Sequence, residues 1–332
     1  MRAAVFHEPG QPLSIEEVPD PAPGPGDLVL RVRGCGICGS DLHIADLPGA
    51  LPAGSVMGHE FSGEVAEVGA AVRGRFRAGE RVCALPFIAC GTCEHCLSGD
   101  GIRCPEIHAT GLGPIPGAYA EYVRVSAVET LRLPESVGFR EGATVEPLAV
   151  GLHAVNEARL EPGEDVLVVG AGPIGLATTL WARFRGARHV IVSERVPSRL
   201  ALAAAFGATD AIDASQQEVP RAFETAAGKG PDVIFECVGL PGLIQQCIAM
   251  ATPRSRIVVA GVCMQPDTLI PGMAVVKGLS LRFVLGYRRQ DFALTLDMLA
   301  AERIRSAPMI TDTVALDGFV AAFEALKRPT QQ

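Results

Sequence analysis

Four cysteines gather in one short stretch of the chain. Cys90, Cys93 and Cys96 recur at every third residue, and Cys104 follows eight residues later. Four thiolates in one loop can complete a tetrahedron around zinc and leave no position for a substrate. The spacing therefore predicts a structural zinc site, with an iron–sulfur cluster or four free thiols as the alternatives.

A second set of metal-binding residue types lies upstream. Cys38 lies in the run Gly-Ile-Cys-Gly-Ser-Asp-Leu-His that ends at His43, and His59 and Glu60 follow in Gly-His-Glu. A thiolate, an imidazole and a carboxylate are the mixed ligands of a zinc ion that keeps one position open for water or substrate. Taken alone, the pattern also fits a buried cysteine and a chance triplet. Asp41, inside the first run, could orient a ligand or cap a turn.

A glycine-rich turn lies in the second half of the chain, directly after a strand expected over Asp165–Val169. Gly170 permits a tight turn, Gly172 lets the backbone approach a pyrophosphate, and Gly175 lets the next helix pack closely on the strand. The free N–H groups of that helix then face the phosphates. The turn predicts a dinucleotide site with the contact residues Gly170, Gly172, Pro173, Ile174 and Gly175.

An acidic residue ends the next expected strand. Glu194 lies 19 positions after Gly175, where a carboxylate can accept hydrogen bonds from both adenosine ribose hydroxyls and repel a 2′-phosphate. This position favours NAD, whereas Arg195 and Arg199 could neutralise that phosphate, so NADP is the alternative. Residues after the later strands are expected beside the nicotinamide or are ordinary loop residues: Val238, Val262, Leu285 and Tyr287.

The chain divides into two regions with different patterns of apolar residues, and the elements expected in these regions would position the motifs. Residues 1 to about 146 have short alternating runs, such as Leu28–Val32 and Phe61–Val68, separated by Pro- and Gly-rich loops such as Pro19–Gly26. From about Glu164, apolar runs alternate with Ala-rich segments, which is typical of βαβ units and a parallel sheet. Six strands are expected, over Asp165–Val169, His189–Ser193, Asp210–Ile212, Val233–Glu236, Arg256–Ala260 and Leu279–Leu285. The last stretch predicts a helix over Phe292–Glu302, a short strand over Met309–Thr313 and a helix from Asp317.

Length and composition exclude several classes of protein. A chain of 332 residues exceeds the length that usually folds around a single hydrophobic core, so we expect two domains. The 48% hydrophobic and 20% charged residues exclude a disordered chain or a coiled coil. A net charge of −8 argues against nucleic acid and anionic membranes as partners. Without a signal segment or an apolar run of about 20 residues, the ten cysteines indicate a reducing cytoplasm.

Together, the Cys38 run, Gly-His-Glu, the four-cysteine segment and the glycine-rich turn resemble the zinc-containing medium-chain alcohol dehydrogenases over nearly the whole chain. Val145-Glu146-Pro147-Leu148 resembles their polyol branch, which includes sorbitol, threonine and butanediol dehydrogenases. The resemblance implies an α/β protein. A GroES-like β-rich catalytic domain is expected over residues 1–148 and 287–332, and a Rossmann domain with a doubly wound parallel sheet over residues 149–286.

The resemblance also implies roles for residues of the first domain. Cys38, His59 and Glu146 match the positions of the catalytic zinc ligands, and Glu60 is an adjacent carboxylate that can exchange with or replace a ligand. Glu146 stands where many alcohol dehydrogenases have a second cysteine, and in the polyol branch it can reach the metal through water instead.

Two further residues match a proton relay in this family. Ser40 matches the hydroxyl that takes the substrate proton, and His43 matches the outer end of the relay to solvent. A helix cap and a surface histidine are the alternatives for these two side chains.

The sequence thus predicts a dehydrogenase with two zinc ions per chain that oxidises a secondary alcohol or vicinal diol to a ketone with NAD. An NADP-preferring carbonyl reductase and a catalytically silent dinucleotide-binding protein are the alternatives. The resemblance implies a homodimer or homotetramer joined through Leu279–Leu285. The chain departs from its relatives in a short segment between His43 and Gly58 and in the tail Arg328–Gln332, where relatives continue into another strand.

Overall fold

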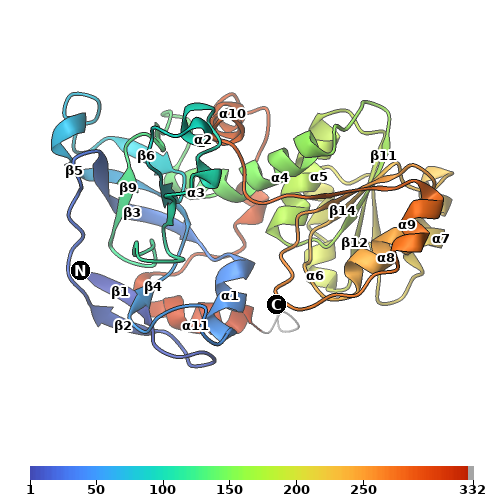
Figure 1. Ribbon diagram of the computed structural model, residues 1–332, viewed down its shortest axis with the longest axis horizontal. Coiled ribbons are helices and arrows are strands. Elements are labelled where there is room, and N and C mark those ends of the chain that lie inside the picture. The colour runs from blue at the N-terminus through green and yellow to red at the C-terminus, as the bar shows by residue number, and fades with distance from the viewer. Residues whose placement is uncertain (328–332) are drawn as a thin grey trace. The chain divides into compact units, whose positions relative to one another are not determined.

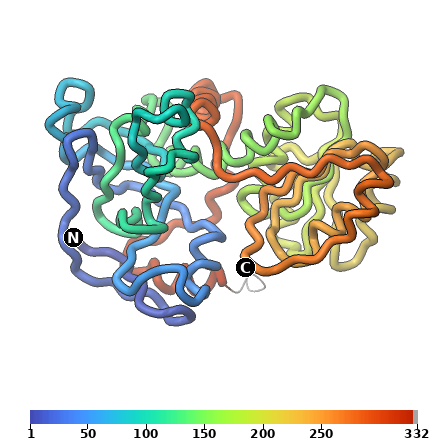
Figure 2. The backbone as a smooth tube through the Cα atoms, in the orientation of Figure 1, coloured from blue at the N-terminus to red at the C-terminus, as the bar shows by residue number. Residues whose placement is uncertain are grey.

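The computed structural model describes residues 1–327, and the chain forms two compact units (Figure 1). The first unit contains Met1–Glu146 and the chain from Arg288 onward, and the second contains Pro147–Tyr287. Figure 2 follows the chain from its blue N-terminus through the first unit, into the second, and back in red. Segments from both ends of the sequence therefore build the first unit.

The first unit is rich in antiparallel strands. A five-stranded sheet has the order β10-β6-β5-β3-β9, a three-stranded sheet has the order β2-β1-β4, and β7 pairs with β8. One hydrophobic core packs against the five-stranded sheet. It fully buries Leu28, Leu30 and Phe61, as the alternating runs that contain them predict. The strands are β1 (Arg2–Phe6), β2 (Ser14–Glu17), β3 (Asp27–Gly36), β4 (Ser55–Val56), β5 (Glu60–Val68), β6 (Arg81–Ala84), β7 (Phe87–Ile88), β8 (His108–Ala109), β9 (Tyr122–Ser126) and β10 (Thr130–Arg132).

Short helices border these sheets. They are α1 (Gly39–Asp46), α2 (Glu94–Leu97), α3 (Phe139–Ala143), α10 (Arg289–Ala300) and α11 (Leu316–Leu326). The strand expected over Met309–Thr313 is wrong: a 3-10 turn over Ala307–Met309 is followed by irregular chain without a ladder partner among the described residues. An apolar run forms a strand only where a sheet edge accepts its backbone groups. The tail Arg328–Gln332 lies outside the described residues.

The second unit is a six-stranded parallel sheet with the order β13-β12-β11-β14-β15-β16. Every residue of β11 is buried, because helices follow the strands and cover a parallel sheet on both faces. The strand order reverses between β11 and β14, which is the crevice where doubly wound sheets bind dinucleotides. All six expected strands are confirmed, with bounds that differ by at most two residues: β11 (Asp165–Val169), β12 (His189–Glu194), β13 (Asp210–Asp213), β14 (Val233–Glu236), β15 (Arg256–Val259) and β16 (Ser280–Phe283).

Six helices belong to this region: α4 (Val145–Glu157), α5 (Pro173–Phe184), α6 (Pro197–Leu200), α7 (Val219–Ala227), α8 (Leu243–Met250) and α9 (Pro271–Lys277). The boundary between the units falls near the start of α4, at Glu146. Among the helices of the described residues, none has both the length and the apolar character that a bilayer crossing requires.

Candidate active site and metal centres

Strand pairing brings Cys38 and His59 together. The end of β3 pairs with the start of β5, so that Gly36 lies opposite Glu60. Cys38 follows β3 by two residues and His59 precedes β5 by one. The ligand atoms of Cys38, His59 and Glu60 all lie within 4.8 Å of one another. The antiparallel register therefore builds the mixed-ligand cluster from two segments of the chain.

The electrostatics of this cluster favour a cation. Burial raises the pKa of the Cys38 thiol, and the Glu60 carboxylate raises it further. Burial and the nearby Glu146 raise the pKa of Glu60 to about 8. Both shifts arise because negative charge accumulates in a site that is shielded from water. A divalent ion supplies the missing positive charge, and a thiolate, an imidazole and a carboxylate are donors that suit zinc.

Asp41 lies behind His59. The Asp41 side chain is fully buried, and its Oδ1 lies 3.2 Å from Nδ1 of His59. Burial lowers the pKa of His59, but the Asp41 carboxylate and Cys38 together outweigh burial and leave this pKa well above its ordinary value. Contact at Nδ1 leaves Nε2 as the metal donor, which is how carboxylates orient metal-binding histidines. Its Oδ2 accepts from the Tyr119 hydroxyl and its Oδ1 faces His59, so of its two expected roles the structure favours orientation.

The other predicted residues of this site lie on two helices. In α1, the Ser40 hydroxyl is half-buried and donates to Cys38 Sγ at 3.2 Å. His43 lies three residues further along the same helix and is exposed. In the first turn of α4, Glu146 is 9% exposed and close enough to Glu60 to raise its pKa. Its carboxylate is not one of the three clustered ligand atoms, so direct ligation by Glu146 stays a prediction.

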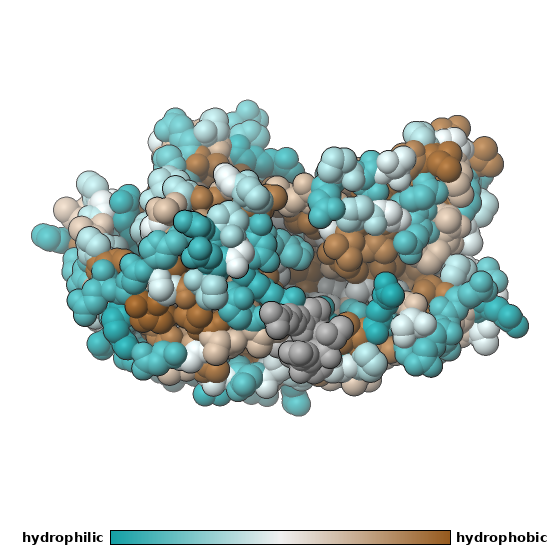
Figure 3. Space-filling view, turned by 90° about the horizontal axis from the view of Figure 1, so that it is seen from below, coloured by the Kyte–Doolittle hydropathy of each residue, from teal (hydrophilic) through white to brown (hydrophobic). Residues whose placement is uncertain are grey.

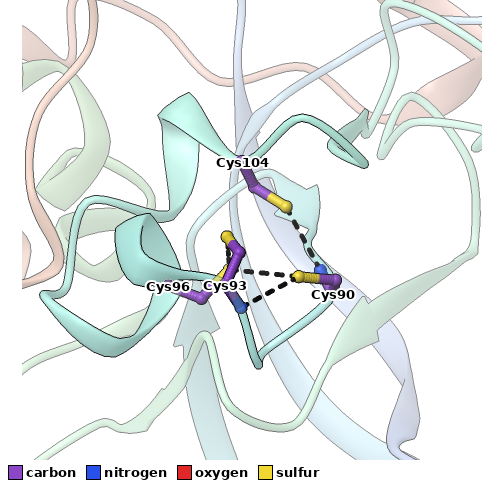
Figure 4. Close-up of side chains that lie close together, drawn as sticks. All are labelled: Cys90, Cys93, Cys96 and Cys104. Carbon is purple, nitrogen blue, oxygen red and sulfur yellow. Dashed lines mark hydrogen bonds between the residues drawn. The ribbon is translucent and has the colours of Figure 1, made fainter.

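The four cysteines form a second cluster. The ligand atoms of Cys90, Cys93, Cys96 and Cys104 all lie within 4.8 Å of one another, and the side chains converge (Figure 4). The N–H groups of Cys93 and Glu106 donate to the Sγ atoms of Cys90 and Cys104, both at 3.4 Å. Such donors stabilise thiolates, and those at Thr92 and Cys93 lower the pKa of Cys90 to about 6. A closed four-thiolate set without a free position fits a structural zinc ion.

The glycine-rich turn has the close contacts that require glycine. At Gly170, φ is +98°, and a Cβ would lie 2.6 Å from Val238. At Gly175, a Cβ would overlap the carbonyl oxygen of Gly170. Gly172 precedes α5 and faces open space, with no atom within 4 Å of a Cβ placed there. That space at the start of a helix suits the approach of a pyrophosphate.

Glu194 is fixed by backbone donors. Its Oε2 accepts from the N–H of Ala171 at 2.8 Å, and its Oε1 accepts from Arg195 at 2.7 Å and from Val196 at 2.9 Å. The contact to Ala171 connects the end of β12 to the glycine-rich turn. The carboxylate is therefore already in place for ribose hydroxyls, next to the expected pyrophosphate position.

The sequence did not point to Glu236, which organises the end of β14. Its side chain is 1% exposed, and its Oε1 accepts from the N–H of Val238 at 2.7 Å and of Gly239 at 2.9 Å. Of the other residues expected beside the nicotinamide, Val262 and Leu285 are exposed and Tyr287 is buried. An acidic residue that ends an apolar strand was the available signal for Glu236.

Comparisons with known proteins agree with this geometry. Residues 24–135 match the family "Alcohol dehydrogenase GroES-like domain", and residues 173–301 match the family "Zinc-binding dehydrogenase". The chain is 35% identical to sorbitol dehydrogenase from Gallus gallus over 335 residues, which covers 98% of this chain and 93% of the relative.

Solved structures give the same result. 2R,3R-butanediol dehydrogenase from Bacillus subtilis matches with a TM-score of 0.87 and 32% identity, and covers 99% of this chain and 97% of that one. An Escherichia coli protein described as a short chain alcohol dehydrogenase, complexed with NADH, matches with a TM-score of 0.89 and 30% identity over 99% and 96% of the two chains. A similar zinc-binding dehydrogenase from Sinorhizobium meliloti is bound to NADP.

Proposed function

The chain belongs to the zinc-containing medium-chain alcohol dehydrogenases, and on that premise we propose that it oxidises a secondary hydroxyl of a vicinal diol or polyol to a ketone with NAD as hydride acceptor. The observation that carries the proposal is the buried cluster of Cys38, His59 and Glu60 beside Ser40. Sorbitol and 2,3-butanediol, the substrates in the names of two similar proteins, both present a secondary hydroxyl next to another hydroxyl.

The residues of the cluster would bind the metal. Cys38 and His59 serve as ligands, with Glu60 or Glu146 completing the set, and bound zinc supplies the Lewis acidity that lowers the pKa of an alcohol. Ser40 Oγ accepts the hydroxyl proton of the substrate while its own proton passes through the cofactor ribose to His43, which releases a proton to solvent. Support for this order comes from α1, where Ser40 contacts the cluster and His43 is exposed.

The cofactor is held by the second unit. The N–H groups at the start of α5 bind the pyrophosphate, and Glu194 accepts hydrogen bonds from the adenosine ribose. The three donors that fix Glu194 favour NAD, because making room for a 2′-phosphate would require those hydrogen bonds to break. Arg195 and Arg199 follow Glu194 in the sequence and support an NADP-linked carbonyl reductase as the second candidate.

The protein is proposed to be a homodimer, with a homotetramer as the alternative. β16 is an edge strand of its sheet, and Phe283 and Leu285 at this edge are 63% and 66% exposed. On the preceding α9, Val275 and Val276 are 77% and 88% exposed. Figure 3 shows apolar surface, in brown, on the second unit at the right of the view. An apolar sheet edge favours pairing with a second copy.

The ten free cysteines support a reducing, cytoplasmic location.

A substrate panel tests the proposal. The purified protein with its zinc content measured is offered simple secondary alcohols, 2,3-butanediol, sorbitol and threonine, each with NAD and with NADP, while nicotinamide reduction is followed. We expect turnover of a vicinal diol with NAD. Faster turnover with NADP throughout would favour the carbonyl reductase. Absence of turnover with both cofactors at full zinc occupancy would favour a silent dinucleotide-binding protein.

A further inference from the structure

A buried tyrosine lies behind the carboxylate that contacts His59. The Tyr119 hydroxyl donates to Asp41 Oδ2 at 2.5 Å, and the other oxygen, Oδ1, lies 3.2 Å from His59 Nδ1. Among the described residues, neither Asp41 Oδ1 nor His59 Nδ1 has a hydrogen-bond partner elsewhere. Asp41 therefore bridges two groups, one at each oxygen, and the tyrosine fixes the plane of the carboxylate that faces the imidazole.

The position of the Tyr119 ring is itself fixed by aromatic packing. Phe319 of α11 lies 4.4 Å from it between ring centroids, at an interplanar angle of 44°. Phe323, one turn further along α11, lies 6.1 Å away at 76°. The three rings belong to one buried apolar cluster, so the tyrosine cannot turn away from Asp41 without disturbing it.

The backbone fixes the same tyrosine relative to the metal-binding segment. The N–H of Tyr119 donates to the carbonyl of Met57 at 2.9 Å, two residues before His59. Gly58 has φ of +100°, and a Cβ there would lie 2.7 Å from the tyrosine ring. The ring thus packs directly on the turn that presents His59.

A neutral hydroxyl suits the buried Asp41 carboxylate better than a charged donor would. Asp41 has no exposure to water, so a carboxylate oxygen without a donor would be costly. An arginine or lysine would satisfy that oxygen but would also compete with His59 for the negative charge. The tyrosine O–H satisfies Oδ2 without placing a second positive charge beside the imidazole.

We propose that Tyr119, backed by α11, is a positioning residue that holds Asp41 and thereby His59 in the orientation that binds zinc. The inference rests on the proposed function, in which His59 is a ligand. It assigns to the C-terminal helix a part in metal binding through the aromatic cluster formed by Tyr119, Phe319 and Phe323.

The variant Tyr119→Phe removes only the hydroxyl and keeps the packed ring. We expect the zinc dissociation constant of the Cys38/His59 site to rise about tenfold, at the low end of the 10- to 100-fold effects of residues that support metal ligands. We also expect the visible absorption of cobalt substituted at that site to shift, because the imidazole is less firmly oriented. The four-cysteine site in the same chain is an internal control and keeps its affinity.

Tyr122→Phe is the matched control, because Tyr122 lies three residues away in β9 with Arg31 over its ring, 5.9 Å from the centroid. It should leave both sites unchanged in a competition titration with a chromophoric chelator. Wild-type affinity and an unshifted cobalt spectrum in Tyr119→Phe, or equal weakening of both sites, would overturn the inference. A wild-type chain that binds zinc only at the four cysteines would contradict the proposed function as well, whereas two bound zinc ions with an unaffected Tyr119→Phe would contradict this inference alone.

Discussion

The choice between NAD and NADP should depend on Glu194, and its hydrogen bonds set the size of the effect. Three backbone N–H groups donate to this carboxylate, at 2.7 to 2.9 Å. A 2′-phosphate could be accommodated only after the side chain moves away from them. At about 1 kcal/mol net for each hydrogen bond, the movement costs about 3 kcal/mol, which corresponds to roughly a hundredfold preference for NAD.

Glu194→Ala removes this cost and also removes the acceptor for the ribose hydroxyls. We expect the ratio of kcat/KM for NAD to that for NADP to fall from roughly a hundredfold to within about tenfold. Most of the change should come from improved use of NADP, because the cost of moving the carboxylate is gone, with a smaller loss in the use of NAD. The assay is steady-state nicotinamide reduction with one saturating alcohol and each cofactor varied in turn.

Glu218→Ala is the matched control for this experiment. Glu218 precedes α7 in the same unit, is exposed, and makes no capping hydrogen bond with its side chain. It should leave the cofactor ratio unchanged. An unchanged ratio in Glu194→Ala, or a wild-type enzyme that prefers NADP, would refute the role assigned to the carboxylate.

Three further outcomes are expected. Cys93→Ala should release one zinc ion per chain and lower the melting temperature, because a structural metal contributes directly to folding; an unchanged zinc content and melting temperature would mean that the four cysteines bind no structural metal. Asp165 accepts hydrogen bonds from Arg188 and His189, which outweigh its burial and lower its pKa from 3.8 to about 2. The ionised form therefore stabilises the fold by about 2 kcal/mol above pH 4, and this contribution is lost as the pH falls toward 2. Denaturation curves should show Asp165→Asn less stable than wild type at pH 7, with the gap closing below pH 4; a gap independent of pH would contradict the ion-pair explanation. Phe283→Glu should convert a dimer to a monomer in light scattering, and a dimer that survives the charge would exclude the β16 edge as the interface.

The second unit was predictable from the sequence because its elements are local. A strand buried on both faces is a continuous apolar run, and β11 is apolar from Val166 to Val169 and buried along its whole length. The glycine-rich turn follows it directly, and steric contacts at Gly170 and Gly175 explain why no other residue fits. Apolar character alone led to the wrong prediction of a strand over Met309–Thr313. No strand in the described part of the chain pairs with this segment.

For the active site, the sequence predicted which residues could bind a metal but not how the fold brings them together. Cys38 and His59 were marked by residue type and flanking motif, whereas their approach depends on the register between β3 and β5. Asp41 and Tyr119 are 78 residues apart, and no periodic pattern connects a buried hydroxyl to a carboxylate at that distance. Long-range polar pairs of this kind come from tertiary packing, which the sequence pattern does not encode locally.

The most direct measurement is zinc content together with NAD-linked turnover in wild type and in Cys38→Ala. Wild type should contain two zinc ions per chain, and a chelator should abolish its turnover. The variant should keep one zinc ion, at the four cysteines, unfold near the wild-type temperature and show no turnover. Cys247→Ala, which removes a buried thiol of α8 outside both clusters, should keep both ions and its activity. Turnover by Cys38→Ala, or two zinc ions retained in it, would contradict a metal site at Cys38 and His59 as the centre of the reaction.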